Sequence, residues 1–246
     1  MSSIKGICFD LGSTLLRFDG SWNQTTIQQG MDRMVAEMDH PKFLDPVFQE
    51  KFLQALEQSR IDREHDHIER PTRDTLRTVF QQHTGLSLSE AVLDSAMQAL
   101  YSISQLSWKE MPGMRQVLEA LSKDGYLLSI ISNAADAEDV HRLIDRIEIR
   151  SYFDPIYISA EVRYRKPRKE IFNMLLDAWG LPPETLVMVG DTLNADIIGA
   201  QQAGMHQIWL ERDLRPHENP EDRERIIPEK TASSLEEVPG LVRSLA

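Results

Sequence analysis

Polar side chains that could do chemistry follow several short apolar runs of the sequence. The candidates at these positions are Asp10, Ser132, Asn133, Lys166, Asp191 and Asp196. In a parallel sheet the carboxyl ends of all strands meet at one edge, where ligands collect. We therefore expect two or three carboxylates, a hydroxyl and an ammonium group to converge there.

This set of groups is suited to phosphoryl transfer. Asp10 and Asp191 would repel each other unless a cation lay between them, and Mg²⁺ favours one or two carboxylates together with phosphate oxygens. Lys166 would add positive charge, and the Ser132 hydroxyl and the backbone N–H groups of Leu11 and Gly12 could bind phosphoryl oxygens. Asp10 could then act as the nucleophile.

The elements that must position these residues alternate between strand and helix. Nearly continuous apolar runs predict buried strands at residues 4–9, 126–131, 155–158, 186–189 and 206–210. Helical patterns occur at residues 114–121, 171–179, 197–203 and 234–245. This alternation predicts an α/β fold with a doubly wound, Rossmann-like parallel sheet.

A long segment after the first strand has a different character. Residues 18–111 carry helical patterns at 25–38, 46–59, 72–83 and 88–106, without a convincing strand. A connection of this length is far too long for a loop. We predict an all-helical cap at residues 18–111, inserted into a catalytic core of residues 1–17 and 112–246. Residues 211–231, charged and proline-containing, are predicted to form a surface excursion.

Composition excludes several classes of protein. The 246 residues carry 39 acidic and 27 basic side chains, a formal charge of −12, which disfavours a nucleic-acid partner. A single cysteine, Cys8, excludes a disulfide framework and is expected to be an inert core thiol. No apolar stretch approaches the roughly 20 residues of a membrane span, and no signal peptide is visible, so we expect no membrane association and a cytoplasmic location.

Four motifs in order resemble those of the haloacid dehalogenase superfamily. They are 9–15 (FDLGSTL), Ser132, Lys166-Pro167 and 190–196 (GDTLNAD), and the helical insert matches that superfamily's C1 cap in position. The resemblance implies a Mg²⁺-dependent hydrolase, a phosphatase acting on a small phosphorylated metabolite, with Asp10 as nucleophile. It implies that Asp10, Asp191 and the carbonyl of Gly12 bind the metal, that Asp196 supports this site, and that Thr14, Ser132 and Lys166 support the phosphate and the nucleophile.

The resemblance has one departure at Gly12. Phosphatases of this superfamily usually carry a general-acid Asp at that position, although some share a glycine there. General acid help is typically worth about 10²–10⁴-fold in rate. Slow ester hydrolysis, cleavage of an acyl phosphate or phosphonate, and ligand binding without turnover are the alternatives. A phosphonatase would need a cap lysine, and Lys42 and Lys51 are the early candidates. A dehalogenase is disfavoured because Asp191 and Asp196 indicate a metal site.

Most of these residues also have a purely structural interpretation. Asp191 or Ser132 could cap a helix, and Gly12 could serve a tight turn. Asp196 could be a solvated carboxylate, and Lys166 could belong to a basic surface cluster. In the cap, His65 and His67 suggest a metal-binding site, although a charged helix end is the favoured interpretation. Arg63 and Arg70 are candidate contacts for a substrate anion, and Phe18 and Trp22 could wall the pocket.

Overall fold

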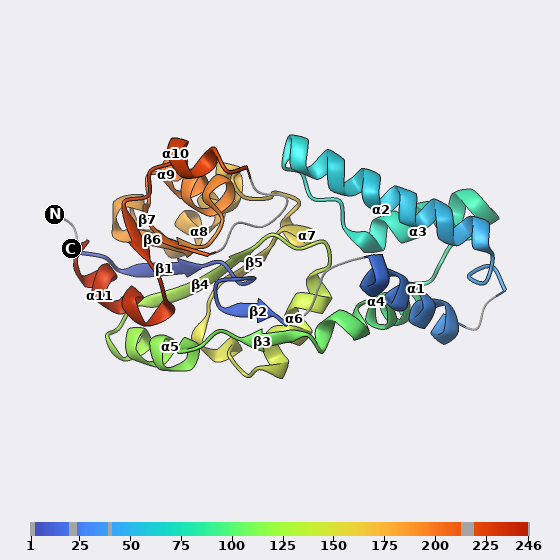
Figure 1. Cartoon of the computed structure of the whole chain (residues 1–246), viewed down its shortest axis with the longest axis horizontal. Helices are drawn as coiled ribbons and strands as arrows, with labels where there is room; N and C mark the ends of the chain where they lie inside the picture. The colour runs from blue at the N-terminus through green and yellow to red at the C-terminus, as the bar shows by residue number, and fades with distance from the viewer. Residues whose placement is uncertain (1–2, 20–23, 39–40, 213–218, 246) are drawn as a thin grey trace. The chain divides into compact units, whose positions relative to one another are not determined.

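The computed structural model describes residues 3–19, 24–38, 41–212 and 219–245. Its main sheet has six parallel strands in the order β5-β4-β1-β6-β7-β8 (Figure 1). The strands are β1 (Gly6–Phe9), β4 (Leu127–Ser132), β5 (Ile156–Ile158), β6 (Leu186–Gly190), β7 (His206–Leu210) and β8 (Lys230–Ala232). The predicted fold class, a doubly wound parallel sheet with a helical cap, is confirmed.

Strand β1 lies inside the sheet between β4 and β6. Gly6 pairs with Leu127 on one side and with Leu186 on the other, and all four residues of β1 are buried. A strand that is covered on both faces needs apolar side chains at every position, which explains the continuous run of the sequence. The register brings the ends of β1, β4 and β6, and therefore the candidate residues, to one edge.

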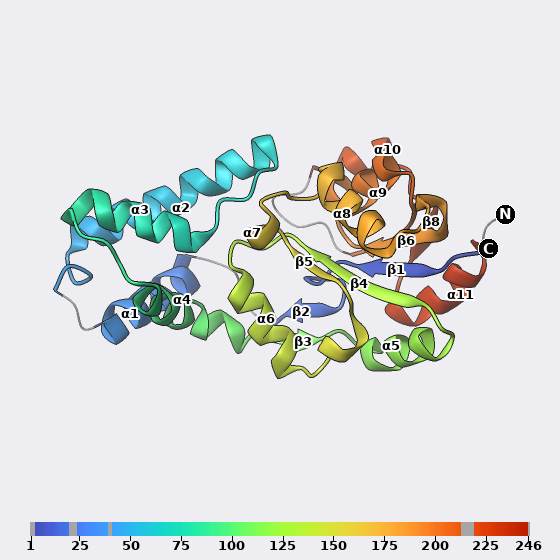
Figure 2. The ribbon, with the colours of Figure 1, turned by 180° about the vertical axis from the view of Figure 1, so that it is seen from behind.

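Helices cover both faces of this sheet (Figures 1 and 2). Helices α8 (Lys169–Trp179) and α9 (Ile198–Ala203) pack on the face that carries Cys8 and Met188, while α5 (Met114–Lys123) and α11 (Val238–Arg243) lie on the opposite face. A Cβ at Gly6 would lie 2.4 Å from the Trp179 ring, so the close approach of α8 to β1 requires glycine there.

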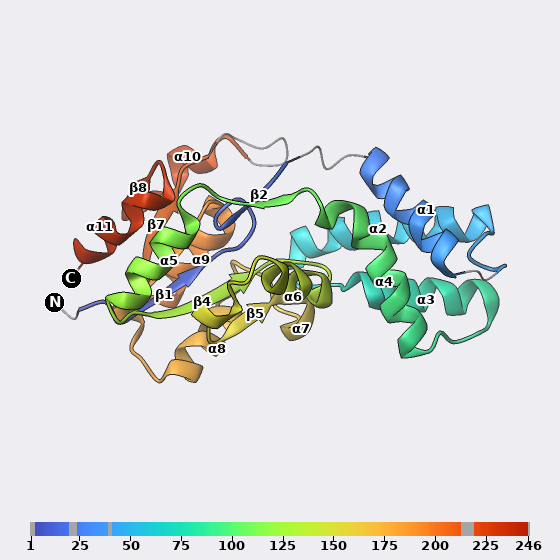
Figure 3. The same ribbon diagram turned by 90° about the horizontal axis from the view of Figure 1, so that it is seen from below.

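The cap segment forms four helices with a core of their own. They are α1 (Gln24–Met38), α2 (Pro46–Asp66), α3 (Thr72–Thr84) and α4 (Glu90–Gln105). Helix α1 packs along α4 and α2 along α3 (Figure 3). Phe43, Phe48 and Phe80 form aromatic pairs with centroid separations of 5.1–5.8 Å in the middle of this core. Each aromatic pair adds to the apolar area that the helices bury together.

The contacts within the chain define two compact units. The first unit is Met1–Arg17, Glu110–Asn133 and Ile147–Ala246, and the second is Phe18–Lys109 and Ala134–Arg146. The second unit therefore includes α6 (Ala137–Arg146), which the sequence analysis places in the core. The boundaries of the catalytic core and of the cap stay a prediction.

Several short elements were not predicted. Strands β2 (Leu16–Phe18) and β3 (Trp108–Glu110) pair with each other, and β8 overlaps the end of the predicted surface excursion. Helices α7 (Ser159–Val162) and α10 (Asp222–Arg225) have four residues each. Elements of three or four residues are too short to show a period in the sequence. The predicted helix at 197–203 begins as a π-turn at Leu193–Ile197. Within the described residues, no helix combines the length and the apolarity that crossing a membrane would take.

Candidate active site

The centre of the candidate site is a buried lysine between two carboxylates. Lys166 Nζ lies 2.6 Å from Asp10 Oδ1 and 2.7 Å from Asp196 Oδ1. Its third contact is a hydrogen bond of 2.6 Å to the carbonyl oxygen of Ile131. Lys166 is only 2% exposed, so its alternative assignment to a basic surface cluster is wrong. The three contacts place the ammonium group firmly beside the Asp10 carboxylate.

Asp191 completes a group of three acids at the same edge of the sheet. Carboxylate oxygens of Asp10, Asp191 and Asp196 all lie within 4.8 Å of one another, and all three residues are buried. If all three are ionised, their charge of −3 against +1 from Lys166 leaves −2. A buried excess of negative charge is costly unless a cation balances it. Hard oxygen donors in this number fit a divalent ion such as Mg²⁺.

The protonation equilibria reflect this crowding. Burial by itself would lower the pKa of Lys166, but the carboxylates of Asp10 and Asp196 outweigh burial, and the pKa rises above its usual value. For Asp196, burial raises the pKa and Lys166 offsets only part of that increase. Asp196 is 1% exposed, so the interpretation as a solvated carboxylate is wrong. The lysine is therefore held in its charged form at neutral pH.

Backbone geometry places Asp196 under the end of β6. The N–H of Thr192 donates to Asp196 Oδ2 at 2.9 Å. A Cβ at Gly190 would lie only 2.3 Å from Asp196 Cγ, so the carboxylate occupies the space that a side chain at residue 190 would fill. Gly190 is thus required by packing against Asp196.

The loop after β1 turns sharply around Gly12. Gly12 bridges to Leu16, Ser13 N donates to Leu16 O at 2.6 Å, and Ser13 has a φ of 64°. The hydroxyl of Thr14, which is fully buried, donates to Asp191 Oδ1 at 3.4 Å. The left-handed backbone of this turn lies at Ser13 and not at Gly12, and the turn brings Thr14 back to the acidic group.

Asn133 holds the lysine through its backbone. Its side-chain amide donates to Lys166 O at 3.0 Å and accepts from Lys166 N at 2.9 Å. Ser132, the last residue of β4, is 5% exposed at the same edge of the sheet. It does not cap α6, because Asp136 accepts the hydrogen bond from Asp139 N at 2.7 Å. The structure thus collects all the candidate residues at one edge, and their catalytic roles stay predictions.

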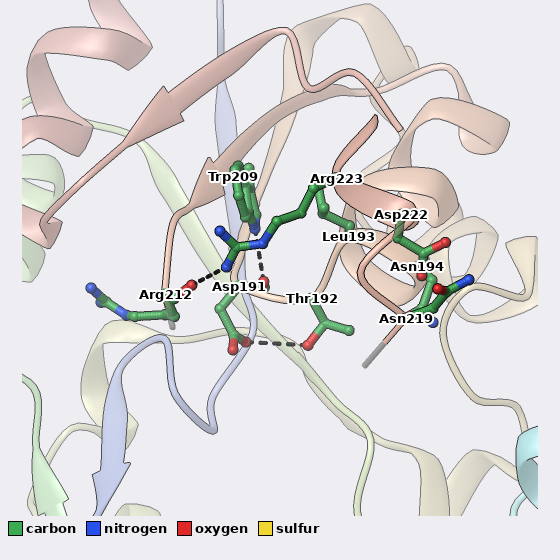
Figure 4. Close-up of a pocket in the computed structure, with 9 residues that line it drawn as sticks. All are labelled: Asp191, Thr192, Leu193, Asn194, Trp209, Arg212, Asn219, Asp222 and Arg223. Carbon is green, nitrogen blue, oxygen red and sulfur yellow. Dashed lines mark hydrogen bonds between the residues drawn. The ribbon is translucent and has the colours of Figure 1, made fainter. Parts of the chain in front are cut away.

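Sequence reasoning missed three neighbours of these residues. Trp209 Nε1 donates to the carbonyl oxygen of Asp191 at 2.8 Å, and Arg223 lies over the Trp209 ring at 5.3 Å (Figure 4). Arg212 Nε donates to Ser13 O at 3.2 Å. Desolvation lowers the pKa of Arg212, against the attraction of Asp191. No local pattern marks these residues, although Trp209 is on β7, the strand next to β6.

Other sequence candidates contact neighbouring side chains, and their proposed roles stay predictions. Arg70 forms an ion pair of 2.7 Å with Asp66, Arg63 lies 3.6 Å from Glu69, and Phe18 packs edge-on against Trp108. Among the described residues, the acidic group around Asp10 is the only cluster of three potential metal ligands, so the clip near His65 and His67 is not supported. Lys42 and Lys51 are exposed, and Trp22 lies outside the described residues.

Cys8 is a core thiol. It is fully buried, and burial raises its pKa to about 12.

The fold and the sequence resemble known proteins. A family model described as haloacid dehalogenase-like hydrolase matches residues 39–210, a range that holds Ser132, Lys166, Asp191 and Asp196 and begins after Asp10. Glyceraldehyde 3-phosphate phosphatase of Pyrococcus furiosus is 35% identical over 102 residues, which cover 42% of each chain. The chain therefore spans less than half of that relative.

Two further likenesses extend over nearly the whole chain. N-acylneuraminate-9-phosphatase of Homo sapiens is 25% identical over 255 residues, covering 100% of this chain and 96% of that protein. The solved structure of 2-haloacid dehalogenase from Pseudomonas syringae pv. Tomato matches with a TM-score of 0.68 at 22% identity, covering 99% and 100% of the two chains. At that identity, the second likeness concerns the fold alone.

Proposed function

Because the chain belongs to the haloacid dehalogenase-like hydrolase family, as its four motifs indicated, we propose that it is a Mg²⁺-dependent phosphatase of a small phosphorylated metabolite. The observation that carries the proposal is the buried contact of 2.6 Å between Lys166 and Asp10 beside two further carboxylates. The two phosphatase relatives, whose names give small phosphorylated compounds, support the substrate class. The C1-cap assignment belongs to the same proposal.

Asp10 is the proposed nucleophile. Its carboxylate attacks phosphorus, the bond from phosphorus to the leaving oxygen breaks, and an aspartyl phosphate forms while the leaving alkoxide takes a proton from water. Water then attacks this phosphoryl group, which releases inorganic phosphate and regenerates the Asp10 carboxylate. Lys166 stays protonated throughout and stabilises the negative charge on Asp10 and on the phosphoryl oxygens. The Ser132 hydroxyl and the N–H groups of Leu11 and Gly12 are the proposed donors to those oxygens.

Mg²⁺ is the proposed cofactor. Asp10 and Asp191, with the carbonyl of Gly12 and support from Asp196, would hold the ion. It would supply positive charge to the phosphoryl group, balancing the excess negative charge of the buried acids.

The test measures phosphate release from a panel of small phosphorylated metabolites, with Mg²⁺ and with EDTA. Wild-type protein is expected to release phosphate from at least one of them in a Mg²⁺-dependent manner, and Asp10→Asn is expected to release none. Equal rates for wild type and Asp10→Asn would refute the proposed nucleophile.

Gly12 favours a second candidate, a ligand-binding protein with little turnover. A glycine offers no side chain to protonate a leaving alkoxide, which costs about 10²–10⁴-fold in rate where such help is needed. Binding of beryllium fluoride distinguishes a protein with an intact Asp10 site, which both candidates have, from one whose site binds nothing. A competent Asp10 site binds it only with Mg²⁺ and gains thermal stability. Gly12→Asp then shows whether the missing acid limits turnover, because the rate rises only in that case.

A further inference from the structure

The loop that follows β1 is closed on itself by backbone hydrogen bonds. The N–H groups of Leu15 and Leu16 both donate to Leu11 O at 2.9 Å, and Ser13 N donates to Leu16 O at 2.6 Å. Ser13 has a left-handed backbone with a φ of 64°, which a residue other than glycine keeps only where surrounding contacts hold it. The conformation of this loop therefore depends on contacts from outside it.

One such contact comes from a side chain just after β7. Arg212 Nε donates to Ser13 O at 3.2 Å, and both residues belong to the first compact unit. Arg212 NH1 contacts the carbonyl oxygen of Ser233, directly after β8, at 3.5 Å. Its NH2 is buried and has no hydrogen-bond partner in the described part of the chain. The shortest contact of the guanidinium is therefore the one that ties the loop after β1 to the end of β7.

The end of β7 is itself held in place. Trp209 Nε1 donates to the carbonyl oxygen of Asp191, the residue that follows β6 (Figure 4). Arg223 lies over the Trp209 ring and donates to the carbonyl oxygen of Arg212. The segment 209–212 thus contacts the backbone of Asp191 on one side and the backbone of Ser13 on the other. It is a common support for two loops that carry proposed Mg²⁺ ligands.

The guanidinium of Arg212 has two effects on a cation at this site, and their signs are opposite. Its positive charge, which Asp191 and Glu236 attract, repels a divalent ion held by Asp191. Loss of the charge alone would therefore strengthen Mg²⁺ binding. Its hydrogen bond holds the residue next to Gly12, so loss of the donor alone would weaken Mg²⁺ binding. The sign of the change in affinity distinguishes the two effects.

We propose that Arg212 is a positioning residue for the loop after β1, and that it acts through its hydrogen bond to Ser13 O. By holding Ser13 it fixes the carbonyl of Gly12, a proposed Mg²⁺ ligand, and the N–H of Gly12, a proposed donor to the phosphoryl group. It also fixes the turn that brings Thr14 to Asp191. This inference rests on the proposed phosphatase function, and it assigns a role to a residue outside the four sequence motifs.

Three substitutions separate the hydrogen bond from the charge. Arg212→Gln keeps an N–H donor at the same number of bonds from the backbone as Nε and removes the charge. Arg212→Lys keeps the charge and moves the donor one bond further out. Arg212→Met removes both. If the hydrogen bond positions the loop, Arg212→Gln behaves like the wild type and the other two variants do not, whereas a role of the charge predicts that Arg212→Lys does.

The first readout is the affinity for Mg²⁺, measured from the rise of the melting temperature over a series of Mg²⁺ concentrations. We expect the Kd to rise about 10- to 100-fold in Arg212→Met and Arg212→Lys, the order typical of removing a group that orients a metal ligand. In Arg212→Gln the Kd is expected to equal the wild-type value or to lie below it. At saturating Mg²⁺, kcat for phosphate release is expected to fall in the same two variants, with KM changed much less.

Hydrogen exchange in EDTA gives a second readout, which needs neither activity nor metal. The three amides that donate within the loop after β1 are expected to exchange faster in Arg212→Met and Arg212→Lys than in wild type, and at the wild-type rate in Arg212→Gln. The matched control is Arg243→Met, because Arg243 is 58% exposed and pairs with Asp124 at 3.0 Å in the same unit. It is expected to leave the Kd, kcat and the exchange rates unchanged.

Wild-type Kd and exchange rates in Arg212→Met or in Arg212→Lys would overturn the proposal. So would a loss in Arg212→Gln as large as that in Arg212→Met, or a change that the control shares. If Arg212→Met does not fold, the comparison of Arg212→Gln with Arg212→Lys decides by the same criteria. Wild-type phosphate release equal to that of Asp10→Asn would instead overturn the proposed function, and exchange in EDTA would still decide whether Arg212 holds the loop.

Discussion

Lys166→Met tests the electrostatic balance of the candidate site. The substitution keeps most of the apolar stem and removes the ammonium group with its three contacts of 2.6–2.7 Å. The net charge of the site, with all three acids ionised, would then be −3 in place of −2. Hydrogen bonds to charged groups contribute about 1.5–3 kcal/mol each, and breaking a buried ion pair by removing one partner costs about 3–5 kcal/mol. We therefore expect the free energy of unfolding to fall by about 3–5 kcal/mol at pH 8 in EDTA.

The pH dependence of this loss has a definite sign. Without the lysine, the pKa of Asp196 in the folded protein rises further above that of the unfolded chain, because Lys166 offsets part of the effect of burial. The folded variant then binds more protons than the unfolded chain, so its stability increases as the pH falls. The difference from wild type is accordingly expected to shrink between pH 8 and pH 5.

Urea unfolding followed by circular dichroism measures both quantities. Lys123→Met is the control, because Lys123 is 79% exposed and lies 3.8 Å from Glu119. It is expected to change the free energy of unfolding by less than about 0.5 kcal/mol. A loss below about 1 kcal/mol for Lys166→Met at pH 8, or a loss that grows toward pH 5, would refute the reasoning. Added Mg²⁺ is expected to recover part of the stability, since it supplies the missing positive charge.

Three further predictions concern single side chains. Gly190→Ala is expected to abolish phosphate release and to lower the free energy of unfolding by about 1–3 kcal/mol, because the added Cβ overlaps Asp196; normal activity would contradict the packing argument. For Asp139→Asn, the free energy of unfolding relative to wild type is expected to be higher at pH 8 than at pH 4, by up to about 3 kcal/mol. The reason is that wild-type stability declines as the pH rises through the pKa of Asp139, which burial raises to about 6. A pH-independent difference in urea unfolding would exclude that assignment. Cys8 is expected to react with a thiol reagent at pH 8 only after unfolding, as absorbance would show, because it is fully buried and its pKa is about 12.

The outline of the fold was accessible from the sequence because it depends on local pattern. The strands that line the site are continuous apolar runs, and the long helices carry repeats of apolar residues, so both could be placed to within a few residues. Strands β2, β3 and β8 could not be placed, since each has three residues of which at least one is charged, whereas the equally short β5 is wholly apolar. Helix α6 was overlooked although its sequence carries the signal, because Val140, Leu143 and Ile144 recur at helical spacing and acidic residues favour a first turn.

The residues of the candidate site were predictable as a set, but their contacts were not. Their types and their positions at strand ends are written in the sequence, and the parallel sheet brings them to one edge. Which atom contacts which was decided by tertiary packing: Lys166 meets Asp10 across 156 positions of the chain, and Asn133 binds the backbone of that lysine in place of solvent. The same holds for Arg212 and Ser13, 199 positions apart. Residue type and local periodicity act over a few residues, whereas burial, charge balance and hydrogen-bond partners exist only once distant segments have packed together.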